Sequence, residues 1–422
     1  MYEMTTLANG LRVLTVTLPH VQSVSLGFFL EVGSRYESEV MAGASHFIEH
    51  MLFRGTKRWP TTLDIAEAIE GKGGVFNAST GLEMTLFWAK VAAAHLPSVL
   101  DVVTDMLLHA TFDPAEIEKE RDVISEEISY SLDAPDSLSQ LLVSQLQWPN
   151  HPLGRDIIGT RQSIASLNRD SLLAYMTDHY RPGRTILGLA GRVNHGEIVT
   201  WANSHLAEWE PAPPAYWEPA PLNGRGPSLQ VQFKDTEQAH LTFSFAGLPR
   251  SDPDRFALRL LNLILGEGMR SRLFQMVRER LGLAYSVESY VSALHDTGSV
   301  GLYAGVGTSR AERAVRAILD ELDRLRQEPV PESELRKALE FIQGRTALSM
   351  EDSFTIAAWY TRQHLLGPEV LEPEEAMERY EAVQPSDIQR LAQSLFQEER
   401  LNLVVVGPFS QNGNRFRQAI RF

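Results

Sequence analysis

The chain has 422 residues, of which 43% are hydrophobic and 22% are charged, a composition typical of a soluble globular protein with two or three domains. It contains no cysteine, so disulfides and thiolate metal ligands are excluded. Its formal net charge of −15 argues against nucleic acid as a partner, because binding DNA or RNA requires a positively charged surface.

The N-terminal residues show neither the pattern of a secretory signal nor that of an arginine-rich transit peptide. No apolar run reaches the roughly 18 residues that a membrane-spanning helix needs. We therefore expect a cytoplasmic protein that does not contact a membrane. The first elements are predicted strands, one opening on the turn signal Asn9-Gly10 and one in the alternating segment 23–33.

Residues 44–53, ASHFIEHMLF, predict a buried helix that carries three titratable side chains. His46, Glu49 and His50 share one face, because positions three and four apart are neighbours on a helix, and most other positions are apolar. Ser45 is the predicted N-cap. Burying two imidazoles and a carboxylate without partners is costly, so these groups need either a ligand or one another.

Two histidines in this spacing direct their ring nitrogens toward one point, as a divalent ion requires, and zinc is the usual ion among histidine and carboxylate ligands. Glu49 would accept a proton from a water molecule that the ion activates, which is the chemistry of a hydrolase. The competing interpretation is a structural hydrogen-bond network of histidine and glutamate. The otherwise apolar helix favours the catalytic metal.

A second helix, predicted over residues 113–132, supplies candidates for the third ligand. Glu120 and Glu127 lie on its apolar stripe, on either side of Val123, whereas Glu126 is rotated about 100° toward solvent. One of the two stripe carboxylates is expected to complete the metal site and the other to orient a histidine. Strands are also predicted on both sides of a Ser-Thr-Gly turn within residues 74–91.

Residues 208–228 contain six prolines and predict an extended linker. The segments on either side of it follow a similar order of elements, and both end in a helix, a turn and a short apolar strand, which close at Gly191 and at Gly407. We therefore infer an internal duplication, with an N-terminal zinc-binding domain over 1–207 and a related domain without the metal motif over 229–422. Strands and helices occur in blocks, which favours an α+β fold.

The motif from His46 to His50, HFIEH, is the inverted zinc motif. The chain resembles the pitrilysin and insulin-degrading enzyme family over nearly its whole length, most closely the half-length bacterial branch that is similar to mitochondrial processing peptidase. The resemblance implies that Glu127, 77 residues after His50, is the third zinc ligand, and that Glu120 is the supporting carboxylate.

The resemblance also implies residues that bind the substrate. The segment FNAST is similar to the family's edge strand, in which Asn77 and Ala78 would hold a substrate backbone by strand addition. The segment SRLFQMVRERLGLAYSV is similar to the family's arginine–tyrosine pair, here Arg278 and Tyr285, of which the tyrosine would stabilise the oxyanion. Without the resemblance, these two would be interpreted as a surface arginine and a core aromatic.

For the whole chain, the resemblance implies two similar tandem α+β domains, each a sheet with helices packed on one face, forming a clamshell around a chamber. It implies one Zn2+ per chain and a homodimer, or a heterodimer with a related chain. The expected function is that of a zinc metalloendopeptidase acting on peptides or unfolded polypeptide segments. The alternatives are a non-catalytic or partner-dependent subunit of a processing-peptidase-like complex, and a hydrolase of a non-peptide substrate.

Overall fold

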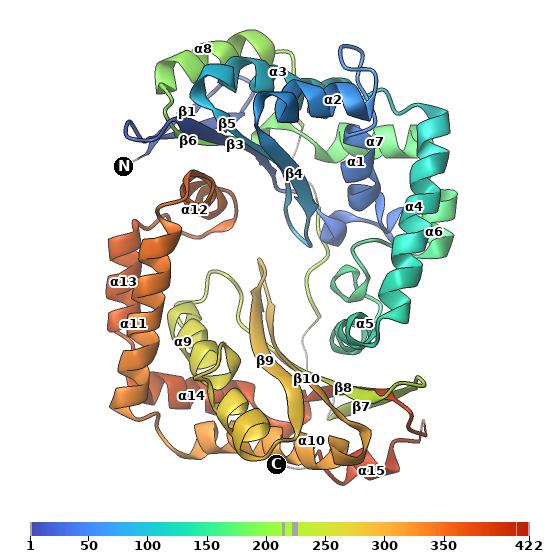
Figure 1. The fold of residues 1–422 in the computed structure, drawn as a ribbon, viewed down its shortest axis with the longest axis vertical. Coiled ribbons are helices and arrows are strands. Elements are labelled where there is room, and N and C mark those ends of the chain that lie inside the picture. The colour runs from blue at the N-terminus through green and yellow to red at the C-terminus, as the bar shows by residue number, and fades with distance from the viewer. Residues whose placement is uncertain (1, 213–215, 222–226, 411, 421–422) are drawn as a thin grey trace. The chain divides into compact units, whose positions relative to one another are not determined.

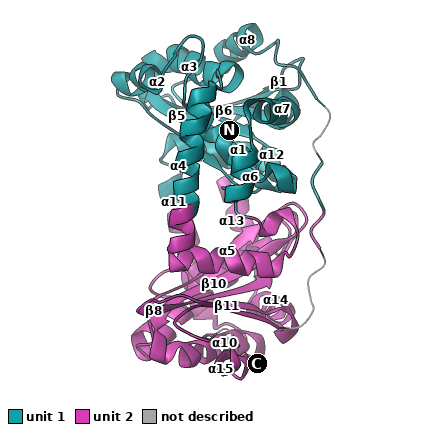
Figure 2. Ribbon diagram, turned by 90° about the vertical axis from the view of Figure 1, so that its right-hand side faces the viewer, with its two compact units in different colours: residues 1–128, 156–218, 346–372 teal, residues 129–155, 219–345, 373–422 magenta. Residues whose placement is uncertain are grey.

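The computed structural model describes residues 2–212, 216–221, 227–410 and 412–420. They form two compact units, each assembled from three segments of the chain (Figure 2). Unit 1 comprises residues 1–128, 156–218 and 346–372, and unit 2 comprises residues 129–155, 219–345 and 373–422. No helix among the described residues is long and apolar enough to cross a bilayer.

Unit 1 contains a six-stranded sheet in the order β1-β2-β6-β3-β5-β4, so β4 lies at one edge (Figure 1). Only the β2–β6 pair is parallel, and the other neighbours are antiparallel. The strands are β1 (Glu3–Thr6), β2 (Arg12–Thr17), β3 (Ser23–Leu30), β4 (Val75–Thr80), β5 (Thr85–Ala92) and β6 (Thr185–Gly191).

Most helices of unit 1 pack on one face of this sheet. Alternate strand residues such as Val13 and Phe28 share a core with Phe47 and Ile48 of helix α1, as the two-residue period of a strand requires. These helices are α1 (Ala44–Leu52), α2 (Thr62–Ile69), α3 (Leu96–His109), α4 (Pro114–Asp133), α6 (Arg161–Ser166), α7 (Arg169–His179) and α8 (His195–His205).

The opposite face of the unit 1 sheet is covered by one helix from the C-terminal half of the chain, α12 (Ser353–Leu366). The intervening strand residues, among them Leu14 and Phe29, form a separate core with Ile356 and Ala357 of α12. The sheet is therefore buried on both faces where α12 lies.

Unit 2 contains a five-stranded sheet in the order β7-β11-β8-β10-β9, with β7 and β11 parallel and the other pairs antiparallel. Strand for strand, this is the arrangement β2-β6-β3-β5-β4 of unit 1, which supports the inferred duplication. The strands are β7 (Ser228–Phe233), β8 (Gln238–Ala246), β9 (Ala284–Ala293), β10 (Gly298–Gly307) and β11 (Asn402–Gly407).

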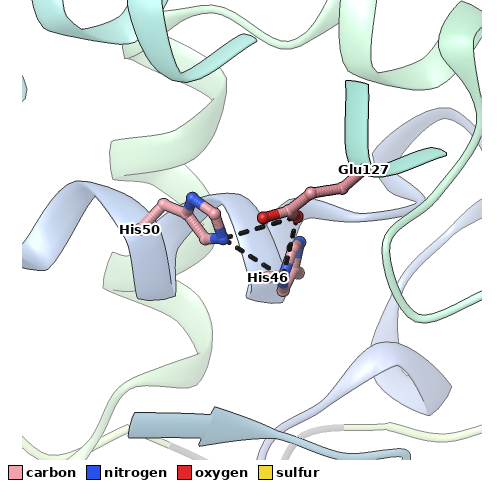
Figure 3. A group of neighbouring side chains, drawn as sticks. All are labelled: His46, His50 and Glu127. Atoms are coloured by element: carbon pink, nitrogen blue, oxygen red, sulfur yellow. Dashed lines mark hydrogen bonds and ion pairs between the residues drawn. The ribbon is translucent and has the colours of Figure 1, made fainter. Parts of the chain in front are cut away.

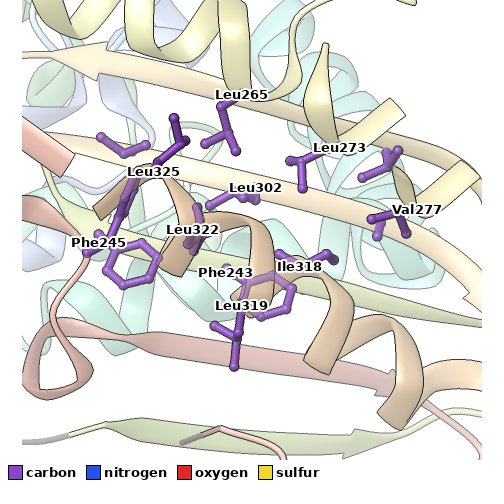
Figure 4. Packing of buried hydrophobic residues seen from close by; sticks show 14 of the residues in the cluster. Phe243, Phe245, Leu265, Leu273, Val277, Leu302, Ile318, Leu319, Leu322 and Leu325 are labelled. Carbon is purple, nitrogen blue, oxygen red and sulfur yellow. The ribbon is translucent and has the colours of Figure 1, made fainter. Parts of the chain in front are cut away.

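The core of unit 2 lies between this sheet and its helices. Figure 4 shows Phe243 and Phe245 of β8 packed with Leu322 and other apolar residues of α10. On the opposite face, Val143 of α5 packs against Val404 of β11. The helices of unit 2 are α5 (Pro135–Gln147), α9 (Arg255–Gly266), α10 (Ala311–Gln327), α11 (Glu332–Ser349), α13 (Pro373–Glu381), α14 (Pro385–Leu395) and α15 (Asn414–Arg417); α4 and α11 cross the unit boundaries in sequence.

The predicted fold class is confirmed for each unit, with the addition of one helix on the second face of each sheet. The predicted domain limits, 1–207 and 229–422, do not coincide with the compact units. The physical reason is that α5 and α12 bury their apolar faces on the sheet formed mainly by the other half of the chain. The predicted linker 208–228 includes residues 213–215 and 222–226, which lie outside the described residues.

Candidate metal centre

Helix α1 carries most of the site, and its start differs from the prediction. Its N-cap is Gly43, in the left-handed region at φ 91°, and not Ser45. Ser45 is buried in the first turn, where its hydroxyl contacts that of Tyr175 at 3.0 Å. The Ser45 N–H donates to the carboxyl group of Glu37 at 2.7 Å. The carboxyl group of Glu37, from the preceding loop, therefore caps the helix, which is the role predicted for Ser45.

His46 and His50 of α1 meet Glu127 of α4 at one point (Figure 3). The two histidine Nε2 atoms are 3.2 Å apart, and Glu127 Oε2 lies 3.8 Å from each. Three donors placed tetrahedrally at about 2.0–2.1 Å from a zinc ion would be roughly 3.3 Å apart, so the residues fit such an ion. In the described parts of the chain, no other group of three histidine, aspartate or glutamate side chains is this close.

Glu120 of α4 lies beside the site and contacts both α1 and the segment that follows it. Its Oε2 is 2.8 Å from His50 Nδ1, and its other oxygen forms an ion pair with Arg54. The side chain is only 2% exposed. A proton held on Nδ1 by Glu120 leaves His50 Nε2 with a free lone pair directed at the metal position. Arg54, which pairs with Glu120, lies two residues after the end of α1 and was not identified from the sequence.

The two histidines have different pKa values. Burial, and after it the charge of the nearby His50, lowers the pKa of His46 to about 4. Burial would also lower the pKa of His50, but its hydrogen bond with Glu120 and the charges of Glu127, Glu120 and Glu49 outweigh burial and raise it. At neutral pH His46 is therefore a neutral imidazole, the form that binds metal ions.

Glu49 lies on the same face of α1 and is anchored by strand β4. The Thr80 hydroxyl donates a hydrogen bond to Glu49 Oε2. Burial raises the pKa of Glu49, and the hydrogen bonds from Thr80 partly offset this. Sequence reasoning missed Thr80, although the alternation of β4 places it on the strand face that also carries Phe76 and Ala78, both packed against the core.

The predicted substrate-binding residues Asn77 and Ala78 lie on β4, at the open edge of the sheet. The Ala78 N–H donates to the side-chain oxygen of Asn77 at 2.8 Å. A main-chain donor of the edge strand is thus engaged by the strand's own side chain.

Helix α4 matches its predicted span within one residue at each end, but its buried stripe is narrower than predicted. The stripe contains Ile117, Glu120, Ile124 and Ile128, whereas Val123 is 41% exposed. Val123 precedes Ile124 by one position, or about 100° around the helix, so it lies beside the stripe.

The predicted pair of unit 2, Arg278 and Tyr285, is brought together by a π-helix over Phe274–Arg280 and by strand β9. The Arg278 guanidinium lies 5.7 Å from the Tyr285 ring centroid and 4.7 Å from that of Phe274. Tyr285 is 76% exposed, which rules out the interpretation as a core aromatic. π-Helical turns are frequent at functional sites.

Two family models match the chain. The model described as insulinase (peptidase family M16) matches residues 12–161, which include every residue of the candidate metal centre. The model described as peptidase M16 inactive domain matches residues 166–341.

Full-length relatives and solved structures agree with these matches. An uncharacterized zinc protease of Streptomyces coelicolor is 34% identical over 99% of this chain and 92% of its own length, and one of Bacillus subtilis is 36% identical over 93% and 95%. The crystal structure of a protease from Helicobacter pylori has a TM-score of 0.91, with 22% identity over 97% of this chain and 99% of that one. A peptidase M16 inactive domain from Pseudomonas fluorescens has a TM-score of 0.90, with 20% identity over 97% and 98%.

Proposed function

Because the chain belongs to the insulinase family, peptidase family M16, we propose that it is a zinc metalloendopeptidase that hydrolyses peptides or unfolded polypeptide segments. The observation that carries the proposal is the convergence of His46, His50 and Glu127 beside Glu49. The full-length relatives are named zinc proteases. The inactive-domain model matches only residues 166–341, which follow the last of these residues. Its name therefore does not argue against activity at the site formed by residues 46–127.

His46, His50 and Glu127 would hold one zinc ion per chain. Zinc bound there would acidify a water molecule and polarise the carbonyl group of the scissile peptide bond. Glu49, held by Thr80, is the general base that takes the proton of the attacking water and then delivers it to the leaving amine. Glu120 keeps His50 in the tautomer that the site requires.

The open edge of β4 supports a peptide as the substrate. An extended peptide that added to this edge would pair with main-chain groups of Ala78 and would replace the side chain of Asn77 as the acceptor of its N–H. Arg278 and Tyr285 are proposed to bind the substrate and the oxyanion, as the family resemblance implied, and their contact with each other supports a joint role.

The decisive experiment compares the wild type with Glu49→Gln. We expect the wild type to contain zinc, to cleave fluorogenic peptides, to lose this activity with a chelator and to regain it with zinc. Glu49→Gln should keep its zinc by elemental analysis and lose roughly 10²–10⁴-fold in kcat, as expected for a missing general base. Glu126→Gln, an exposed carboxyl change on α4, is the matched control and should be unaffected.

Two outcomes would contradict the proposal. Full turnover by zinc-loaded Glu49→Gln would remove Glu49 from its role. A zinc-loaded wild type that cleaves nothing in a peptide library would favour the alternatives, which are a non-catalytic or partner-dependent subunit and a hydrolase of another substrate.

A further inference from the structure

The start of helix α1 depends on a side chain from the loop that precedes it. Glu37 lies in this loop, between β3 and α1, and is only 3% exposed. Its Oε2 accepts the N–H of Gly43 at 2.7 Å, and its Oε1 accepts the N–H of Ser45, also at 2.7 Å. The first N–H groups of a helix have no partner within the helix, and the N-cap Gly43 has no side chain to supply one.

Using both oxygens of one carboxyl group has a geometric consequence. A single hydrogen bond would leave the first turn of α1 free to pivot about it, whereas two bonds to the N–H groups of Gly43 and Ser45 define its position and its orientation. The negative end of Glu37 also lies at the positive end of the helix dipole, where it is stabilising.

The loop itself is held firmly against the turn between β4 and β5. The N–H groups of Ser34 and Arg35 donate to the carbonyl oxygens of Gly81 and Leu82, at 3.2 and 2.9 Å. The Arg35 side chain, 1% exposed, forms an ion pair of 2.6 Å with the buried Glu83. Glu37 thus extends from a fixed support and not from a loose loop.

The two histidines of the site differ in how they are anchored. His50 is held by Glu120 through Nδ1, but the buried Nδ1 of His46 has no hydrogen-bond partner among the described residues. Because no hydrogen bond at Nδ1 orients the ring of His46, its position depends on the backbone of the first turn. That backbone includes Gly43 and Ser45, whose N–H groups Glu37 accepts, and Ser45 directly precedes His46.

We propose that Glu37 is a positioning residue of the metal centre, which places His46 by capping the first turn of α1. The expected effect on catalysis rests on the proposed function, whereas the capping of α1 by Glu37 does not. Glu37 fixes the backbone that carries His46, whereas Glu120 contacts the ring of His50 directly.

The test compares Glu37→Gln with Glu39→Gln, which makes the same charge change at an exposed position of the same loop. A glutamine retains one acceptor and turns its amide N–H groups toward a backbone N–H. We expect zinc affinity, measured by competition with a chelator, to fall about 10-fold or more, as for other residues that orient metal ligands. At saturating zinc, kcat should fall while KM stays near the wild-type value. Glu39→Gln should match the wild type in both.

If Glu37 had only a structural role, Glu37→Gln would lower the melting temperature, but zinc affinity and kcat measured well below that temperature would not change. That result would overturn the proposal. Glu37→Asp keeps both carboxyl oxygens on a shorter side chain and should give an intermediate loss of zinc affinity.

If neither variant folds, amide hydrogen exchange of the zinc-free wild type tests the cap instead. The N–H groups of Gly43 and Ser45 should exchange slowly, and exchange at the unprotected rate would overturn the cap. A wild type that neither binds zinc nor cleaves peptides would refute the proposed function, and the exchange measurement would still test Glu37.

Discussion

At the candidate metal centre, the chemistry of His50 depends on the side chain that contacts its Nδ1. Glu120 connects His50 to Arg54, and this chain of contacts keeps a buried carboxyl group paired on both of its oxygens. The pKa of Glu120 is lowered despite burial, because the hydrogen bond of His50 and the charge of Arg54 outweigh the cost of desolvation. Removing Glu120 would therefore affect both the histidine and the arginine.

We expect Glu120→Ala to weaken zinc binding by roughly 10–100-fold, because His50 would lose the group that fixes its tautomer. Equilibrium dialysis against a zinc buffer measures this. Glu126→Ala on the same helix is exposed and serves as the control. Unchanged zinc affinity in Glu120→Ala would show that His50 does not need this partner.

A histidine away from the site should make the stability depend on pH. His179 stacks near Tyr175, with ring centroids 4.2 Å apart, and its pKa is lowered to about 4 by burial and then by the charge of Arg184. The unfolded chain takes up this proton near pH 6.5, whereas the folded protein takes it up only near pH 4. Between these values the unfolded state binds more protons, so stability falls as the pH falls.

We therefore expect His179→Gln to reduce the loss of unfolding free energy between pH 6.5 and pH 4, by at most about 1.4 kcal/mol per pH unit. Urea unfolding at several pH values provides the measurement. His20→Gln, at an exposed position, should leave the slope unchanged. A slope in His179→Gln equal to that of the wild type would assign the acid sensitivity to other groups.

At the scale of elements, the close packing of α12 on the unit 1 sheet depends on a glycine. Gly188 lies on β6, and a Cβ atom there would come within 2.2 Å of the Thr361 hydroxyl oxygen of α12. Thr361 is fully buried. The absence of a side chain on β6 therefore makes room for Thr361 of α12. The sequence alone does not show this contact, because the two residues are far apart in it.

We expect Gly188→Ala to lower the unfolding free energy by about 1–3 kcal/mol, the usual cost of overpacking. Thr361→Ala in the same chain should recover part of this loss, since it removes the nearest atoms. Gly71→Ala, where an added Cβ meets nothing within 4 Å, is the control. Thermal or urea denaturation measures all three, and additive effects of the two changes would contradict the contact.

At the scale of the molecule, the exchange of α5 and α12 between the sequence halves makes each unit depend on both ends of the chain. A fragment that ends at residue 218 contains the whole sheet of unit 1 but lacks α12. Its uncovered face would expose apolar residues, among them Leu14 and Phe29, and such a patch favours aggregation.

The homodimer expected from the family resemblance stays a prediction, which the molecular mass of the protein in solution would test.

We expect the fragment 1–218 to bind a hydrophobic dye and to aggregate. The same fragment joined to residues 346–372 by a flexible linker should bind less dye and unfold at a higher temperature. Dye fluorescence, light scattering and thermal melting distinguish the two. Equal stability of both fragments would show that α12 is dispensable for unit 1.

The sequence by itself determined the local chemistry of this protein. The apolar helix with His46, Glu49 and His50 and the stripe with Glu120 are short-range patterns, and the periods of helix and strand are enough to read them. The duplication was also readable, because both halves repeat the same order of elements. The choice of Glu127 over Glu120 required the family resemblance, since both carboxyl groups lie near the same stripe.

Only the tertiary structure decided which distant residues support those patterns. The carboxyl group that accepts the first N–H groups of α1 belongs to Glu37, and the hydroxyl that binds Glu49 belongs to Thr80. The helix α12 covers the sheet of the first half of the chain. None of these partners has a fixed spacing from the residue it contacts. Such contacts depend on how strands pair and layers pack, and the periodicity of a single segment carries no information about that.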